Sequence, residues 1–239
     1  MRTPRRVGYE ELSRRFSCFS DADSLFSIPV SPRRRYGNVG VDELVILSAM
    51  TRSINPRTIF EFGRFDGLTT LCLAQSAPKA KVYTLDLPYG GSGSDHTGYA
   101  PNAPAVARNR WEREGVNNRI AEILMDSESF DPGAYLGGSL IGAIDLVFID
   151  ANHDYDHIRH DTDSALSMLS PGGVVIWHDY FKRSFPGVTA HLAELAETHE
   201  VFWVQSPGHP DYLETSLCYR LGTYKPGCNP QISTLPLIL

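Results

Sequence analysis

Acidic residues stand directly after apolar runs at five places in this 239-residue chain. A carboxylate accepts hydrogen bonds from ligand amines or hydroxyls, binds divalent cations and removes protons. Short apolar, β-branched runs are typical of buried parallel strands, whose carboxyl ends meet at one edge of a sheet. The sequence therefore predicts a ligand site at such an edge, built from Glu61, Asp86, Asp126, Asp150 and Asp179.

The most informative of these runs is residues 58–70, where Glu61 is followed by Gly63 and Gly67 before a helical pattern begins at Thr69. Glycines allow a tight turn and a close approach of a ligand to the backbone. The spacing E-x-G-x-x-x-G lacks both the G-x-G-x-x-G of dinucleotide-binding turns and the G-K-[ST] of phosphate-binding loops. The acid favours a ligand that carries an amine, so we assign both glycines to a turn that binds such a nucleotide-like ligand.

Two further acids fit an adenosine ligand. Asp86 ends the next apolar run, residues 81–86, about twenty residues after the glycine turn, where an acid accepts hydrogen bonds from ribose hydroxyls. Asp126 and Ser127 follow a third run, residues 120–125. Asp-Ser is also ordinary turn chemistry, and the sequence leaves both readings open.

The remaining two acids belong to a long pattern. Residues 144–150 end at Asp150 and are followed by His153 and Tyr155, and residues 174–180 end in His-Asp-Tyr after a helical stretch and Ser-Pro-Gly-Gly. Together with the glycine turn, this order resembles the class I S-adenosylmethionine-dependent methyltransferases. It is similar in particular to a subgroup that modifies small hydroxylated molecules, over roughly residues 40–222.

The resemblance implies an α/β fold with a Rossmann-like, seven-stranded, mostly parallel sheet, helices on both faces and the last strand antiparallel. The length suits one such domain with a sizeable core. We expect a catalytic domain over residues 40–222, between a basic N-terminal arm (1–39) and a C-terminal tail (223–239).

The resemblance also implies the cofactor, S-adenosylmethionine, and the place of its parts. Its amino-acid end would lie against Glu61 and Gly63, and its ribose against Asp86. Its adenine would lie against Asp126 or Ser127. The expected reaction is methyl transfer to an oxygen of a small hydroxylated acceptor.

Two routes to an activated acceptor follow from the sequence. In the first, Asp150 and Asp179 bind a divalent cation such as Mg²⁺, which lowers the pKa of the acceptor hydroxyl. Tyr180 stands where related enzymes carry a third ligand, which weakens this route. In the second, His153 or His178 is the general base.

Other readings compete with the methyltransferase. The chain could bind the cofactor without methyl transfer, or act as an NAD-dependent oxidoreductase, although the G-x-G-x-x-G turn and a Tyr-x-x-x-Lys pair are both missing. His153, His157 and His160 have helical spacing that could ligate zinc, but the acids among them favour a solvated helix face. The polar loop 88–104 is either a lid or an insertion.

Composition limits the partners. The net charge is −6, and the arm up to Arg35 holds eight arginines and four acids, leaving 14 of the 22 basic and 24 of the 28 acidic residues for the rest. An acidic body argues against nucleic acid, and we expect the arm to pack on the body or on a second subunit of a homodimer. No apolar stretch suits a membrane span or a secretory signal, which predicts a cytoplasmic protein.

Overall fold

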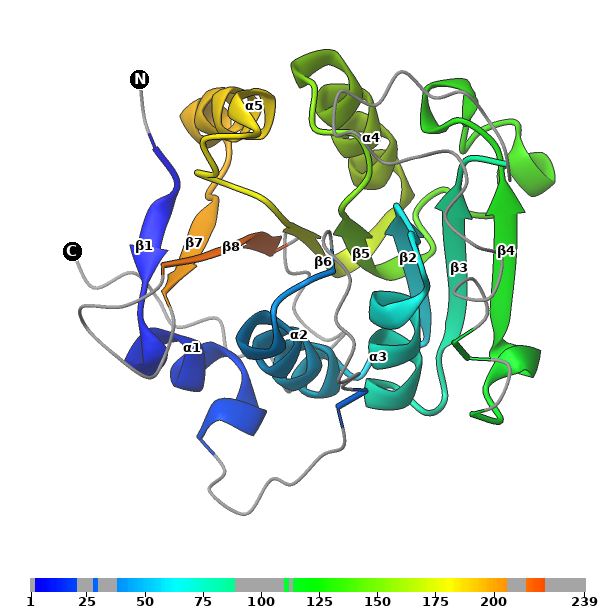
Figure 1. Ribbon diagram of the computed structural model, residues 1–239, viewed down its shortest axis with the longest axis horizontal. Coiled ribbons are helices and arrows are strands. Elements are labelled where there is room, and N and C mark those ends of the chain that lie inside the picture. Colours follow the sequence, from blue (N-terminus) through cyan, green and yellow to red (C-terminus); the bar gives the residue numbers. More distant parts are fainter. Residues whose placement is uncertain are drawn as a thin grey trace.

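The computed structural model describes residues 3–20, 28–29, 38–88, 110–111, 114–205 and 214–221. One eight-stranded sheet runs through these residues, in the order β1-β7-β8-β6-β5-β2-β3-β4 (Figure 1). Its strands are β1 (Arg5–Val7), β2 (Thr58–Phe62), β3 (Lys81–Asp86), β4 (Ile120–Leu124), β5 (Ile144–Ile149), β6 (Leu169–Trp177), β7 (Phe202–Gln205) and β8 (Glu214–Leu221). The α-helices are α1 (Tyr9–Arg15), α2 (Val41–Ile54), α3 (Leu68–Ser76), α4 (Tyr155–Met168) and α5 (Pro186–Thr198).

All paired strands are parallel except β8, which runs antiparallel to β6 and β7. The predicted Rossmann-like class, with a mostly parallel sheet and an antiparallel last strand, is confirmed. The predicted count of seven strands is one too low, because β1 pairs with β7. A strand of three residues has too few positions to show the period-2 pattern by which strands are recognised.

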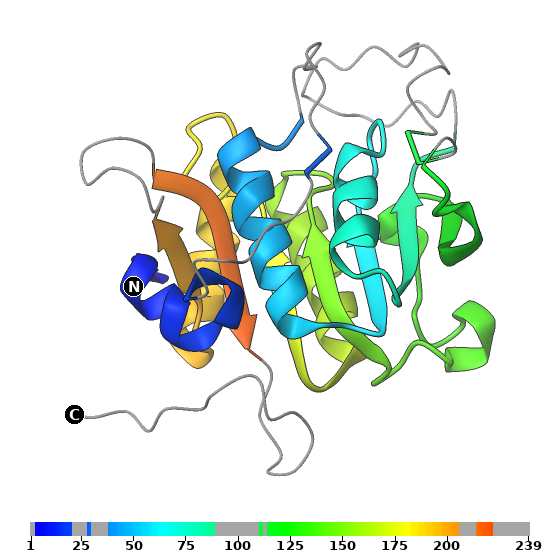
Figure 2. The ribbon, with the colours of Figure 1, turned by 90° about the horizontal axis from the view of Figure 1, so that it is seen from below.

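Helices cover both faces of the sheet. Figure 2 shows α2 and α3 on one face, with α4 and α5 behind the strands. Each strand contributes side chains to the cores on both faces of the sheet, because successive side chains point in opposite directions. In β5, Leu146 and Phe148 join the core under α2 and α3, whereas Val147 and Ile149 join the core under α4 and α5. Such strands must be apolar at nearly every position, which is why they read as continuous apolar runs.

The connections reverse direction between β5 and β2. From β2 the chain proceeds outward to β3 and β4, then returns to β5 and continues to β6 on the other side. In open α/β sheets, ligands bind outside the carboxyl ends of the strands at such a point. The ends of β2 and β5 lie side by side there, with the Asp150 N–H donating to the Phe62 carbonyl at 2.9 Å.

Residues 3–20, the larger described part of the N-terminal arm, pack on the sheet of their own chain. Leu12 of α1 and Phe16 are fully buried in the same core as α2 and α3. The guanidinium of Arg6 lies 4.7 Å from the centre of a Trp203 ring, and that of Arg15 lies 4.3 Å from the Phe202 ring. The arginines near the start of the chain thus cover aromatic residues of β7.

Several predictions concern residues outside the described ranges. They include most of the loop 88–104 and the tail 223–239; most of residues 105–114, whose sequence is typical of a helix, also lie outside these ranges. The homodimer and the division at residue 40 also stay predictions. Among the described helices, none has both the length and the apolar character needed to cross a bilayer.

Candidate active site

The glycine turn joins β2 to α3, and both of its predicted glycines have left-handed backbone conformations. Gly63 has φ +84°, and a Cβ built there would lie 2.0 Å from the carbonyl oxygen of Asp150. Gly67 has φ +77°, and its Cβ would lie 2.3 Å from the Trp111 ring. The chain itself therefore excludes side chains at both positions, by backbone conformation and by close packing.

Glu61 is fully buried beneath this turn. One carboxylate oxygen, Oε2, accepts hydrogen bonds from the hydroxyls of Thr84, at 2.5 Å, and of Thr70. The other oxygen, Oε1, is buried and has no hydrogen-bond partner among the described residues. Burial raises the pKa of Glu61 to about 7, against the lowering effect of the two threonine hydroxyls. A carboxylate oxygen without a donor is suited to a ligand amine.

Asp86, at the end of β3, faces the same turn. It accepts hydrogen bonds from the backbone N–H groups of Phe65 and Leu87, both at 2.7 Å. Arg64, only 3% exposed, lies 3.9 Å from Asp86 and forms a 2.6 Å ion pair with Glu122 of β4. Burial raises the pKa of Asp86, and the charge of Arg64 opposes this rise. Nothing in the sequence pairs Arg64 with Glu122, because only the fold brings β4 next to β3, within reach of the Arg64 side chain.

Asp126 and Ser127 lie just beyond β4, at the far side of β3 from the glycine turn. The Asp126 side chain accepts a hydrogen bond from the Glu128 N–H at 3.1 Å, which begins the short 3₁₀ helix Ser127–Ser129. Ser127 is buried. Asp126 therefore does act as a turn residue, which was one of the two readings that the sequence left open. The other reading, a contact of Asp126 or Ser127 with the adenine, stays a prediction.

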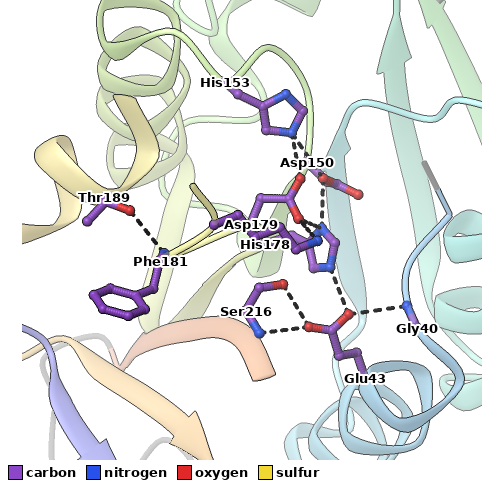
Figure 3. Close-up of polar contacts among 10 residues, drawn as sticks. Gly40, Glu43, Asp150, His153, His178, Asp179, Phe181, Thr189 and Ser216 are labelled. Atoms are coloured by element: carbon purple, nitrogen blue, oxygen red, sulfur yellow. Dashed lines mark hydrogen bonds and ion pairs between the residues drawn. The ribbon is translucent and has the colours of Figure 1, made fainter. Parts of the chain in front are cut away.

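The other predicted residues converge beyond the ends of β5 and β6 (Figure 3). His178 Nδ1 lies 3.0 Å from a carboxylate oxygen of Asp150 and 3.0 Å from one of Asp179. His153 Nε2 lies 2.8 Å from the other oxygen of Asp179 and 3.8 Å from Asp150. In the described part of the chain, Asp150, His153 and Asp179 are the one group whose ligand atoms lie close enough, within 4.8 Å, to share a metal ion.

Glu43 of α2 completes this cluster. Its Oε2 lies 3.0 Å from His178 Nε2, on the opposite edge of the ring from the two aspartates. Its Oε1 accepts hydrogen bonds from the Ser216 N–H at 2.8 Å and the Ser216 hydroxyl at 2.7 Å. Neither residue was predicted, since a glutamate in the first turn of a helix is expected there for capping and for the helix dipole.

Burial and mutual charges shift the pKa values of four members of the cluster: Glu43, His153, His178 and Asp179. Burial lowers the pKa of His178, but the charges of Asp150 and Asp179 more than reverse this and hold it well above its usual range. Burial likewise lowers the pKa of His153, and hydrogen bonds to Asp150 and Asp179 raise it to about 9. Burial raises the pKa values of Glu43 and Asp179, yet contact with His178 holds both well below their usual range.

The backbone after β6 is unusual. Asp179 and Phe181 both have positive φ, +64° and +62°, which is rare for residues with a side chain. The Phe181 N–H donates to the Thr189 hydroxyl at 3.0 Å, and its ring points away from the carboxylates (Figure 3). Lys182 forms an ion pair with Asp179. Residues in this conformation gather at functional sites, where surrounding contacts enforce them.

The remaining aromatic and histidine side chains of this region lie away from the cluster's carboxylates or in the core. Trp177 and Tyr180, which flank His178 and Asp179 in the sequence, are both buried in the core. His153 precedes α4, so it does not share a helix face with His157 and His160. His157 instead lies 3.3 Å from a carboxylate oxygen of Glu128.

Comparisons with known proteins place the chain in a family. The family model described as "Methyltransferase domain" matches residues 60–180, just over half of the chain. A Mycobacterium tuberculosis protein named "Probable O-methyltransferase" is 27% identical over 184 residues, covering 74% of this chain and 70% of that protein. Catechol O-methyltransferase B of Danio rerio is 26% identical over 182 residues, covering 74% of this chain and 53% of that protein.

Solved structures agree with these relatives on the fold. The crystal structure of the O-methyltransferase TomG from Streptomyces achromogenes, in complex with S-adenosylmethionine, superposes with a TM-score of 0.58 at 21% identity, over 78% of this chain and 82% of that one. The resemblance drawn from the glycine turn and the His-Asp-Tyr segment is confirmed. The chain belongs to the methyltransferase-domain family, within the class I S-adenosylmethionine-dependent O-methyltransferase-like proteins.

Proposed function

We propose that this protein transfers the methyl group of S-adenosylmethionine to an oxygen of a small hydroxylated molecule. The observation that carries this proposal is the contact between the glycine turn and the acidic cluster at one edge of the sheet. Gly63 packs directly on the backbone of Asp150, so a donor in the turn would lie beside an acceptor held by the cluster. Methyl transfer needs mainly this positioning, because the sulfonium donor is already activated.

Residues in and near the glycine turn are suited to bind the amine, the ribose and the adenine of S-adenosylmethionine. The unpartnered Oε1 of Glu61 would accept a hydrogen bond from the donor's amine. The Asp86 carboxylate, held by two backbone N–H groups, would accept from the ribose hydroxyls. Asp126 or Ser127, beyond the neighbouring strand, would meet the adenine. A buried carboxylate would attract the amine of this donor, whereas it would repel the negative charge of a phosphate ligand.

The cluster supports a divalent cation. Two carboxylates and an imidazole, from Asp150, Asp179 and His153, offer ligand atoms at mutual distances that one ion can bridge. Mg²⁺ prefers oxygen ligands, whereas the imidazole suits Mn²⁺ and other transition metals. A cation bound there would lower the pKa of the acceptor hydroxyl. Its ligands would come from the ends of β5 and β6, and β5 lies beside β2, which leads into the glycine turn.

The alternative route uses a histidine base, and the geometry separates its two candidates. Both ring nitrogens of His178 already face carboxylates, and the ring is buried, so it has no free position for an acceptor proton. The His153 ring stacks on Phe185, with ring centres 3.8 Å apart. Its Nε2 faces Asp179, whereas its Nδ1, although buried, has no hydrogen-bond partner among the described residues. His153 is therefore the base in this route, once it is deprotonated.

Transfer of labelled methyl from S-adenosylmethionine to a panel of catechols, phenols and sugars tests the function. The assay is run with Mg²⁺, with Mn²⁺ and with EDTA. We expect metal-dependent turnover, at least about 100-fold lower in Asp150→Asn, because ligand removal disables the cation. The control is Asp154→Asn, the same change at an exposed position four residues away.

The outcomes separate the alternatives. Turnover that survives EDTA and is lost in His153→Ala would favour the histidine base. Binding of S-adenosylhomocysteine without turnover on any acceptor would favour a cofactor-binding protein that performs no methyl transfer. Equal turnover in Asp150→Asn and wild type would remove Asp150 from the mechanism.

A further inference from the structure

Three carboxylates from distant parts of the chain surround one buried imidazole. Asp150 and Asp179 face His178 Nδ1, and Glu43 faces Nε2, each at 3.0 Å (Figure 3). The His178 side chain is 3% exposed. An ionised carboxylate only accepts hydrogen bonds, so both ring nitrogens must donate. The ring is thus a two-sided donor, anchored at one edge by Glu43 and in contact at the other edge with both predicted metal ligands.

Glu43 is itself firmly held. The Gly40 N–H donates to Oε2 at 3.2 Å, alongside His178, and Ser216 donates twice to Oε1. Both oxygens are therefore engaged, and the residue is buried. These donors come from the start of α2 and from β8, so Glu43 ties His178 to both elements.

Neither Glu43 nor Ser216 lies within residues 60–180, the part matched by the family model. The outer support of the site therefore comes from segments on either side of that part. The support reaches the reacting groups only through His178, because Glu43 contacts neither aspartate in the hydrogen bonds and ion pairs described.

We propose that Glu43 is a positioning residue of the methyl-transfer site. It fixes the ring of His178, and the ring holds the Asp150 and Asp179 carboxylates in the relative position that a cation and an acceptor hydroxyl require. This inference rests on the proposed function. It predicts that Glu43 contributes to metal affinity and turnover while leaving cofactor affinity unchanged, which a residue that only stabilises the fold would not do.

Glu43→Gln is the most informative variant because it removes the charge and keeps the size of the side chain. The glutamine oxygen can accept from Ser216, but its NH₂ group then faces the N–H of His178, and two donors cannot pair. We expect Mn²⁺ affinity, measured by electron paramagnetic resonance, to fall about 10-fold to 100-fold, as when outer partners of metal ligands are lost. Turnover should fall by a similar factor, and S-adenosylhomocysteine affinity should stay within about twofold.

Two further variants complete the design. Asp42→Asn makes the same chemical change one residue earlier, at an exposed position of α2, and should bind Mn²⁺ like the wild type. Ser216→Ala removes one of the two Ser216 donors to Glu43 and should weaken Mn²⁺ binding in the same direction, by a smaller factor. It also replaces Glu43→Gln if that variant does not fold by circular dichroism.

A spectroscopic readout is independent of metal and turnover. In ¹⁵N-labelled protein, the His178 ring should carry protons on both nitrogens, and Glu43→Gln should change the Nε2 signal. A folded Glu43→Gln with wild-type Mn²⁺ affinity and turnover overturns the proposal. If the wild type neither binds Mn²⁺ nor turns over, the proposed function fails. The inference about Glu43, which rests on that function, then fails with it, whatever the His178 signals show.

Discussion

The Glu61→Gln substitution removes a carboxylate that folding buries completely. Burial raises the pKa of Glu61 from its ordinary 4.5 to about 7, because the hydroxyls of Thr70 and Thr84 only partly offset the loss of water. A group with a raised folded-state pKa contributes stability that is fully present below its unfolded pKa and is lost as the pH rises through its folded pKa. The protein should therefore lose stability from this residue between pH 4.5 and somewhat above pH 7.

The size of the effect follows from the same two values. Each pKa unit corresponds to about 1.4 kcal/mol, so the full shift is worth about 3 kcal/mol, of which about 2.5 kcal/mol falls between pH 5 and pH 8. Glutamine does not titrate. The unfolding free energy of Glu61→Gln, relative to that of the wild type, should thus rise by about 2 to 3 kcal/mol from pH 5 to pH 8.

Urea unfolding of the cofactor-free protein at pH 5, 6, 7 and 8 measures this difference, with Glu10→Gln as a control at an exposed glutamate. A difference that does not change with pH, or that moves in favour of the wild type, would refute the reasoning. The same variant should bind S-adenosylhomocysteine more weakly, because an amide offers no charge to the ligand's amine. Higher stability at pH 8 with weaker cofactor binding would identify Glu61 as a residue kept for function at the expense of stability.

Three further substitutions test the surroundings of the site. Gly63→Ala should cost about 3 kcal/mol or more in urea unfolding, because its left-handed backbone and its contact with Asp150 leave no room for a methyl group; stability near that of the wild type would contradict the turn geometry. Arg64→Met should cost about 1 kcal/mol at most through the lost ion pair, because the Glu122 side chain is 28% exposed and water can replace Arg64; a much larger loss would show that Arg64 has a further structural role. Leu12→Ala should cost about 2 to 5 kcal/mol if the N-terminal arm belongs to the core, and a loss below about 1 kcal/mol would show that it does not.

Much of the fold could be predicted because buried parallel strands have a strong sequence pattern. The apolar runs that end at Asp86 and Asp150 correspond to β3 and β5, within one residue. Since neighbouring parallel strands end at one edge, the approach of Asp150 to Asp179 also followed from the sequence. Residues 170–173, Ser-Pro-Gly-Gly, are typical of a break between a helix and a strand. They lie within β6, whose pairing with β5 is irregular between Ile144 and Leu146.

The rest of the site could not be predicted because its partners are far apart in sequence. Glu43 and His178 are 135 residues apart, and Glu43 and Ser216 are 173 apart. Nothing local distinguishes Glu43 from a glutamate that only caps its helix. Arg64 could not be assigned to Glu122 for the same reason, and the pairing of β1 with β7 joins the start of the chain to its last third.

Calorimetric titration of the purified protein with S-adenosylhomocysteine, and separately with NAD, tests the central claim most directly. We expect micromolar binding of S-adenosylhomocysteine, weakened in Asp86→Ala, and no binding of NAD. Failure of folded protein to bind S-adenosylhomocysteine, or binding of NAD in its place, would contradict the assignment of the glycine turn to a methyl donor.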